Sequence, residues 1–190
     1  MIRKSVLTML AVVGVSALGS VATLSGASAE MSVRVGGAPM YASRTIIENA
    51  VNSKDHTTLV AAVKAAGLVD TLEGPGPFTV FAPTNKAFAK LPAGTVDTLL
   101  KPENKATLTA VLTYHVVAGK MSGADLMAAV KAGGGKATLK TVEGGSLTVE
   151  KKHGKLELID AKGDHAIITV ADVHQSNGVI HVIDTVLLPQ

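Results

Sequence analysis

Six histidines are the side chains in this sequence that could ligate a metal or transfer a proton: His56, His115, His153, His165, His174 and His181. No two of them have the close His-x-x-x-His spacing that puts two ring nitrogens on one helix face. The chain has no cysteine, which excludes a disulfide framework and every thiolate site. We therefore predict no metal site and no cofactor, although histidines from distant segments could still meet in the fold.

The motifs of the common enzyme classes are absent. The sequence has no Gly-x-Ser-x-Gly turn, no His-Glu-x-x-His helix, no Gly-x-x-x-x-Gly-Lys phosphate loop and no calcium loop. Catalytic groups can also come from dispersed positions, because they need only meet in space. We expect a non-enzymatic protein without catalytic residues and keep one alternative, a hydrolase with a dispersed Ser or Thr, His and carboxylate.

His115 follows a helical pattern that points its side chain inward. Leu108, Val111 and Leu112 precede it at spacings of seven, four and three residues, so all four share one face. This pattern predicts a neutral core histidine whose ring nitrogens pair with backbone or hydroxyl groups.

His181 stands between Ile180 and Val182 in a strand-like apolar run, which again predicts a core histidine. Asp184 lies three residues further on and therefore on the opposite face of a strand. The two are poor candidates for a catalytic pair.

The first 29 residues have the pattern of a secretion signal. Arg3 and Lys4 precede an uncharged run from Val6 to Leu24, and Ala27-Ser28-Ala29 has the small-x-small form of a cleavage site. An uncleaved membrane anchor is the alternative, since the run is nearly long enough to span a bilayer. We expect cleavage, a secreted or periplasmic location and no membrane span in the mature chain.

The chain that remains after the expected cleavage has almost no net charge. The chain carries 18 Lys and Arg against 15 Asp and Glu, and removing Arg3 and Lys4 leaves it almost neutral. The basic pI of the full sequence is therefore no argument for nucleic-acid binding, and we predict that the protein binds no nucleic acid. Residues 30–44 have no sustained period and are predicted to be a linker or a loosely attached arm, followed by one folded domain over residues 45–189.

All three phenylalanines lie in one short stretch, Phe78 to Pro92, of a chain with only 3% aromatic residues. The run ending at Phe81 reads as a buried strand, Pro83 stops it, and Thr84 can cap the helix that carries Phe88. We expect the three rings to meet and form the centre of the core.

Apolar residues recur with different spacing in the two halves of the domain. Helical spacing recurs before and after this stretch, for example in a helix ended by Gly67 and another capped by Ser122 with Asp125. Beyond residue 135 the pattern alternates, as in strands, and Asn177-Gly178 marks a turn between two runs that are apolar on both faces. The sequence predicts an α+β domain.

Three segments together resemble the signature stretches of the fasciclin-like domain family: Thr79 to Phe88, Thr113 to Val117, and Asn177 to Pro189. The resemblance implies a β-wedge or sandwich with helices packed along one side, and no catalytic machinery. It also carries over a partner-binding role, known from an integrin-binding segment of animal members, to Tyr114 and His115.

From this resemblance we expect an exported cell-adhesion or surface-interaction module whose partner is a cell-surface or matrix protein or carbohydrate. The exposed loops available to it include the basic hairpin tip from Lys152 to Lys155, which we read as a solvated turn. The rival function is a carrier of a small apolar ligand. An apolar pocket without charged groups would favour the carrier, and a fully packed interior would favour the interaction module.

Overall fold

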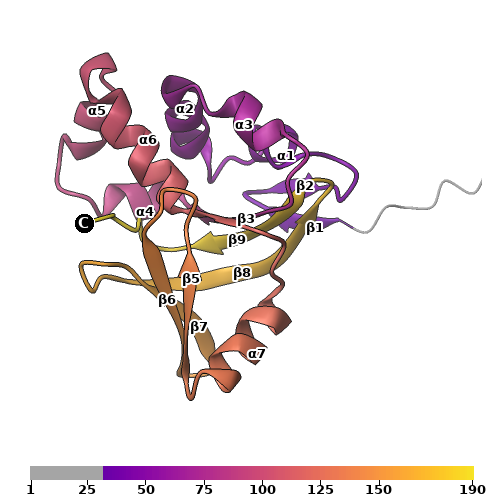
Figure 1. The fold of residues 1–190 in the computed structure, drawn as a ribbon. Coiled ribbons are helices and arrows are strands. Elements are labelled where there is room, and N and C mark those ends of the chain that lie inside the picture. The colour runs from indigo at the N-terminus through magenta and orange to yellow at the C-terminus, as the bar shows by residue number, and fades with distance from the viewer. Residues whose placement is uncertain (1–31) are drawn as a thin grey trace, which may run out of the picture.

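Seven strands pair in one mixed sheet in the computed structural model, which describes residues 32–190 (Figure 1). They are β3 (Phe78–Pro83), β4 (Val116–Ala118), β5 (Lys136–Lys140), β6 (Ser146–Lys152), β7 (Lys155–Ile159), β8 (His165–Gln175) and β9 (Gly178–Ile183). Their order across the sheet is β4-β3-β9-β8-β7-β6-β5. Neighbours are antiparallel except β3 and β9, which run parallel.

The helices of the described residues pack around this sheet, most of them on one side. They are α1 (Ile46–Ala50), α2 (Thr57–Ala66), α3 (Val69–Glu73), α4 (Asn85–Ala89), α5 (Thr95–Leu99), the 3-10 turn η1 (Pro102–Asn104), α6 (Lys105–Tyr114) and α7 (Gly123–Ala132). Figure 1 shows α1 to α6 gathered above the sheet, whereas α7 lies at the far end against β5 and β6. The α+β class and the wedge with helices along one side are confirmed.

The two ends of the sheet order meet. Val117 in β4 forms an isolated antiparallel bridge with Thr141, just past β5, and the N–H of Val142 donates to the carbonyl of Val116 at 2.8 Å. The sheet is therefore nearly closed on itself. This closure brings the end of α6, which leads into β4, beside the turn between β5 and β6.

Caps expected from the sequence set the helix ends. Ser122 and Asp125 form a reciprocal capping box at the start of α7. The Thr84 hydroxyl accepts the N–H of Ala87 at 3.2 Å and so begins α4 directly after β3. Gly67 ends α2 with φ 73°, a left-handed conformation that a side chain disfavours.

The core divides into two clusters, one on each face of β3 and β9. Val80 and Ala82 face the helices, while Phe81 faces the cluster formed with the strands β5 to β8 and α7. Successive side chains of a strand point to opposite faces, so a central strand covered on both sides must be apolar throughout. All six residues of β9 are buried, as its two-faced apolar pattern predicts.

The prediction that the three phenylalanine rings lie together is wrong. Phe78 and Phe88 pack in the cluster beneath the helices, and Phe81 lies in the other cluster. The reason is the strand period: Phe78 and Phe81 are three residues apart, an odd number, so their rings leave β3 on opposite faces. The stretch contributes to both halves of the core and is the centre of neither.

The predicted linker or arm contains ordered structure. Strands β1 (Val33–Val35) and β2 (Ala38–Met40) form an antiparallel hairpin. Val35 and Met40 are buried in the cluster beneath the helices, so this part of the arm belongs to the fold. A three-residue strand is too short to show a period, which is why the sequence pattern gave no signal.

The starts of α2 and α3 lack a side-chain cap. His56 is the residue before the first turn of α2 and its side chain makes no cap bond. The segment after Gly67 forms a further short helix, α3, and Leu68 before it cannot supply a cap either. Within residues 32–190 no helix is long and apolar enough to cross a membrane, and the predicted signal over residues 1–29 lies outside the described residues.

Asn177 joins three elements at the turn before β9. Its amide nitrogen donates to the carbonyls of Leu72 at 2.7 Å and Gly74 at 2.9 Å. Its amide oxygen accepts the N–H of Ile46, the first residue of α1, at 3.0 Å. The predicted Asn-Gly turn is confirmed, and it also anchors α1 and the end of α3 to the sheet.

Candidate functional site

Tyr114, the last residue of α6, has a buried ring and a hydroxyl that connects two loops. The hydroxyl donates to the carbonyl of Ser146 at 2.8 Å and accepts the N–H of Ala161 at 3.0 Å. Ser146 follows the turn after β5, and Ala161 lies in the loop between β7 and β8. Burial raises the pKa of Tyr114 above its ordinary value, so the phenol stays protonated and able to donate.

His115, at the C-cap of α6, is a fully paired core histidine. Its Nδ1 lies 2.8 Å from the carbonyl of Val111, and its Nε2 accepts the N–H of Leu187 at 3.0 Å. These partners require the proton on Nδ1. Burial lowers the pKa of His115 to about 4, against a smaller opposing effect of the Val111 carbonyl, so the ring is neutral near pH 7. The predicted inward orientation is confirmed.

Both residues of the expected partner-binding pair are thus buried, Tyr114 at 1% and His115 at 3% exposure. In this conformation neither side chain offers a surface to a macromolecular partner. Their partner-binding role stays a prediction, and if they fill it they do so by positioning the loops to which they are bonded.

An open groove lies over the Tyr114 hydroxyl. Its walls are the turn from Glu143 to Ser146, the half-buried Thr148 on β6, the loop at Asp160 and Ala161, and the last two residues of the chain. The groove encloses about 590 Å³ and is lined by both polar and apolar atoms. A hydroxyl at its floor binds both walls, so Tyr114 sets their separation.

Asp160 fixes the rest of the groove. One carboxylate oxygen accepts the N–H groups of Lys162 and Asp164, both at 2.9 Å, and the other accepts the N–H of Leu188 at 2.9 Å. The loop after β7 and the C-terminal tail are therefore held against each other. A carboxylate with three backbone donors is a rigid structural group.

His181 in β9 is also a core residue, as predicted. Its ring stacks on Phe81 with centroids 5.7 Å apart. Its Nε2 lies 2.9 Å from the Met121 carbonyl, and its Nδ1 accepts the N–H of Asp172 at 3.3 Å. Burial lowers the pKa of His181. Asp184 points away from it and pairs with Lys90 at 3.3 Å, so the two do not form a catalytic pair.

Sequence reasoning missed a third buried histidine, His56. Its Nδ1 lies 2.8 Å from the Ser53 hydroxyl, in the loop between α1 and α2, and the residue is 3% exposed. Among the described residues no carboxylate hydrogen-bonds this pair, and Asp55 acts on His56 only through its charge. The Ser-x-x-His spacing was the available signal, and a serine–histidine pair without an orienting carboxylate lacks the third part of a hydrolase triad.

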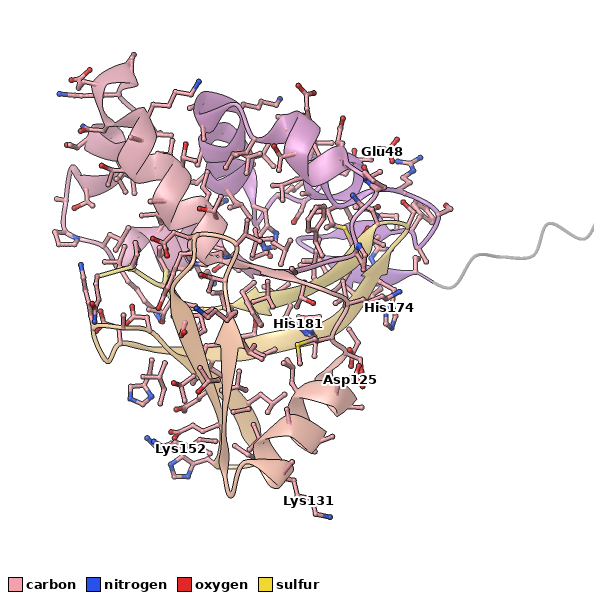
Figure 2. The ribbon with its side chains drawn as sticks, in the orientation of Figure 1. Glu48, Asp125, Lys131, Lys152, His174 and His181 are labelled. Atoms are coloured by element: carbon pink, nitrogen blue, oxygen red, sulfur yellow. The ribbon has the colours of Figure 1, made fainter. Side chains whose placement is uncertain are left out.

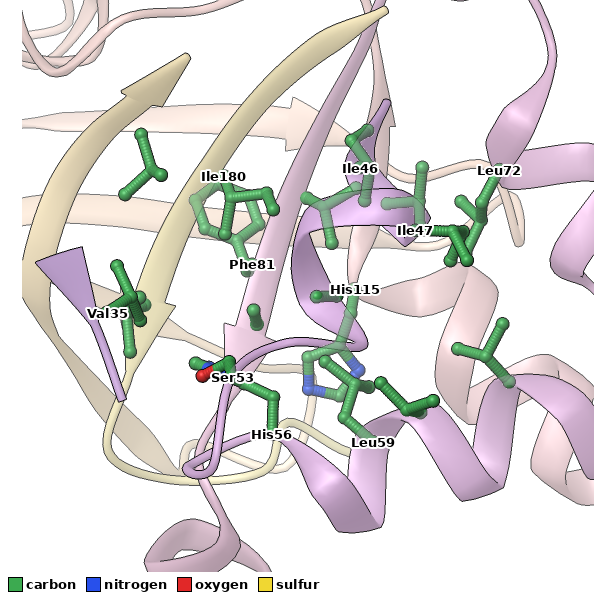
Figure 3. A pocket seen from close by; sticks show the side chains of 18 of the residues that line it. Val35, Ile46, Ile47, Ser53, His56, Leu59, Leu72, Phe81, His115 and Ile180 are labelled. Atoms are coloured by element: carbon green, nitrogen blue, oxygen red, sulfur yellow. The ribbon is translucent and has the colours of Figure 1, made fainter. Parts of the chain in front are cut away.

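An apolar cavity of about 40 Å³ lies beneath α1 and α2 (Figure 3). Its walls come from those helices, β3, β9 and the β1–β2 hairpin, and include Val35, Ile47, Leu59, Val80 and Ile180. No charged side chain lines it, and its polar side chains are Ser53, His56 and His115. The interior is therefore not fully packed, and an uncharged apolar cavity is the feature that we expected to favour the carrier alternative.

One group of side chains in the described part of the chain has the spacing of metal ligands. Ligand atoms of Glu150, Glu157 and His165 lie within 4.8 Å of one another on the outer strands. Glu157 already pairs with His165 at 3.1 Å and with Lys152 at 4.0 Å, and Lys136 pairs with Glu150 at 3.1 Å. The arrangement is that of a surface ion-pair network, in which lysines neutralise the two carboxylates.

Figure 2 places Lys152 and Lys131, the latter on α7, at the end of the wedge far from α1 to α6. The basic hairpin tip is exposed, and the carboxylate of Glu157 balances part of the positive charge of Lys152. Both observations agree with the prediction of a solvated turn.

Both the sequence and the fold of this protein resemble those of known proteins. The family model of the Fasciclin domain matches residues 54–189. The chain belongs to the fasciclin domain family. A solved FAS1 domain pair from the insect cell adhesion molecule fasciclin I superposes with a TM-score of 0.68 at 23% identity, covering 76% of this chain and 51% of that one. That likeness shows the fold, and the chain spans about half of the solved pair.

Fasciclin-domain relatives of bacterial origin are more similar in sequence. Protein sll1483 of Synechocystis sp. is 49% identical over 160 residues, which cover 84% of this chain and 82% of that protein. Immunogenic protein MPB70 of Mycobacterium bovis is 39% identical over 74% of this chain and 66% of its own length. Cell surface glycolipoprotein MPB83 of the same species is 42% identical over 64% of this chain and 48% of its own length.

Proposed function

We propose that this protein is an exported, non-enzymatic interaction module that binds a protein or carbohydrate on a cell surface or in the surrounding matrix. One observation carries the proposal: the buried Tyr114 hydroxyl binds both walls of the open groove, at 2.8 and 3.0 Å. Two relatives support the setting, since one is named a cell surface glycolipoprotein and another comes from a cell adhesion molecule.

The groove has the chemistry that a polar partner requires. Glu143 is exposed at its rim, and the half-buried Thr148 adds a hydroxyl on the β6 wall. A partner with hydroxyl or amide groups, such as a sugar or a peptide backbone, finds acceptors there together with apolar contact area. Asp160 and Tyr114 are held by hydrogen bonds to backbone groups. Binding a partner in the groove therefore costs little conformational entropy in this protein.

Tyr114 and His115 act in this proposal as positioning residues. Tyr114 holds the two loops, and His115 holds Leu187 and hence the tail that completes the groove. Neither needs to touch the partner.

The test is binding of the fluorescently labelled protein to intact cells of its own source, with and without blocking the groove. Thr148→Arg places a long charged side chain on the groove wall, and Met127→Arg places the same group on the exposed face of α7 as a matched control. We expect Thr148→Arg to reduce cell binding at least tenfold and Met127→Arg to leave it within twofold of the native protein.

Treating the cells beforehand separates the two partner classes. Loss of binding after protease treatment identifies a protein, and loss after periodate oxidation identifies a carbohydrate. Normal binding by Thr148→Arg, or equal loss by both arginine variants, would remove the groove from the proposal.

A further inference from the structure

The cavity beneath α1 and α2 combines an apolar wall with one buried polar atom that has no hydrogen-bond partner in the described part of the chain. Its lining is aliphatic apart from a few ring and hydroxyl groups, and it contains no charge. At about 40 Å³ it is larger than the roughly 10–15 Å³ that one water requires. It therefore has room for a few non-hydrogen atoms of a guest.

His56 presents the unpaired atom. Its Nδ1 is occupied by the Ser53 hydroxyl, while its buried Nε2 has no hydrogen-bond partner among the described residues. A backbone interaction with Ala82 opposes part of the fall in the pKa of His56 that burial causes. The contact falls short of hydrogen-bond geometry, so Nε2 keeps no partner of full strength. Buried side-chain nitrogens are nearly always paired in native proteins, because an unmade bond costs stability.

The Ser53 contact limits what can bind at Nε2. If Ser53 donates to Nδ1, the proton sits on Nε2, which then requires an acceptor. If Nδ1 donates to Ser53, Nε2 requires a donor. A hydroxyl group serves in either case, whereas a carboxylate serves only the first and would bring a charge into an uncharged cavity.

We infer that this cavity is a binding site for a small apolar molecule, or the apolar end of a longer one, that carries one hydroxyl group paired with Nε2 of His56. The site does not depend on the groove or on the interaction function proposed above. It gives the carrier alternative a specific location and a chemical class of ligand.

The rim of the cavity shows where a longer guest would leave it. Ala50 at the end of α1 and Val60 on α2 line the cavity and are half-buried, whereas Val35 and Met40 close it from the hairpin. The hairpin pairs through a separate two-stranded sheet, so this wall is the least tied to the seven-stranded sheet. A guest longer than the cavity would displace this wall first.

The probes are 1-butanol and 1-chlorobutane, which match in shape while only the alcohol forms strong hydrogen bonds. Each is titrated into the purified protein and followed by ¹H–¹⁵N NMR of the backbone amides and the histidine rings. We expect saturable shifts in α1, α2 and β3 for both probes, roughly fivefold tighter binding of the alcohol, and a shift of the His56 Nε2 resonance with the alcohol alone.

Four variants separate the contributions, the last of them as a control. His56→Phe keeps a ring and removes Nε2, so we expect equal affinity for both probes, whereas Ser53→Ala retains Nε2 and keeps the preference for the alcohol. Val80→Ile adds a methylene at the cavity wall and should weaken both probes at least fivefold. Val149→Ile makes the same change in the other cluster and should leave both affinities unchanged.

The native protein alone can overturn the inference, even if a variant does not fold. Equal affinity for the two probes would remove the role of His56. Shifts that map outside the cavity, or that do not saturate, would remove the site itself.

Discussion

Nε2 of His115 accepts the backbone N–H of Leu187 at 3.0 Å, across 72 residues of sequence. The same ring is bonded to the Val111 carbonyl within its own helix. One neutral imidazole therefore fastens the end of α6 to the chain beyond β9. Because all three groups are buried, no water can replace either bond if the ring is lost.

Replacing His115 by Phe is the direct test of this contact. The variant keeps a ring of similar size but leaves the Leu187 N–H and the Val111 carbonyl without a partner, and we expect a loss of about 2–4 kcal/mol in the free energy of unfolding. Urea denaturation measures it. His174→Ala, at an exposed position of β8, is the control and should change stability by less than about 0.5 kcal/mol. A similar, small effect in both variants would contradict the assigned role.

Stability should fall as the pH is lowered through the histidine range. The pKa of His115 is about 4 in the fold against 6.5 as its ordinary value, and the pKa values of His56 and His181 are also lowered, in each case mainly by burial. Below pH 6.5 the unfolded chain therefore binds more protons than the fold, and stability is lost progressively between pH 6.5 and 4. His115 alone accounts for up to about 3 kcal/mol.

The measurement is the unfolding free energy at a series of pH values in this range. The slope should be shallower in His115→Phe, which lacks one of the three groups. An unchanged slope would mean that His115 is not the neutral buried base described here.

Tyr114→Phe tests whether the hydroxyl holds the groove. We expect a loss of about 1–2 kcal/mol, since two backbone groups lose one shared partner, and faster hydrogen exchange of the Ala161 amide. Tyr41→Phe is the matched control: Tyr41 is only half-buried, under the Arg44 guanidinium, and its loss should leave Ala161 exchange unaltered. Slow exchange at Ala161 in both variants would show that the loop is held by other contacts.

Gly178 allows the close approach of β3 and β9. A Cβ at this position would overlap the backbone carbonyl of Phe78, which cannot move without breaking the parallel pairing. We expect Gly178→Ala to cost about 1–3 kcal/mol in thermal or urea unfolding. Ser176→Ala changes an exposed residue of the same turn and should be nearly neutral. The prediction fails if both alanines are tolerated alike.

The proposed export can be tested at the N-terminus of the mature chain. If residues 1–29 are a cleaved signal, intact-mass measurement of the protein recovered from the periplasm or the medium should give a chain beginning at Glu30. A mass that retains the apolar segment would instead support the membrane anchor.

The parts of the fold that the sequence predicted are those with a local cause. Thr84, Ser122 and Gly67 mark helix ends through bonds or dihedral angles within a few residues, and the structure has them as expected. The alternating strands of the second half were equally readable, because one face of each meets water.

The parts that were missed depend on contacts between distant segments. The hairpin at Val35 and Met40 is ordered by packing on the core and has no pattern of its own. The separation of Phe78 from Phe81 follows from strand parity, which a count of aromatic residues ignores. The cavity at His56 forms only where α1, α2 and β3 come together, so no spacing along the chain announces it.

The bridge from Val117 to Thr141 has a further consequence for how this protein can associate with other chains. A sheet that ends in bare strands is a template on which other chains can polymerise, and this one joins its first and last strands instead. A partner that binds by adding a strand to the sheet would find few unpaired backbone N–H and C=O groups at the bridge between Val117 and Thr141. At this junction, both strand addition by a partner and edge-to-edge growth with further copies of the chain are disfavoured.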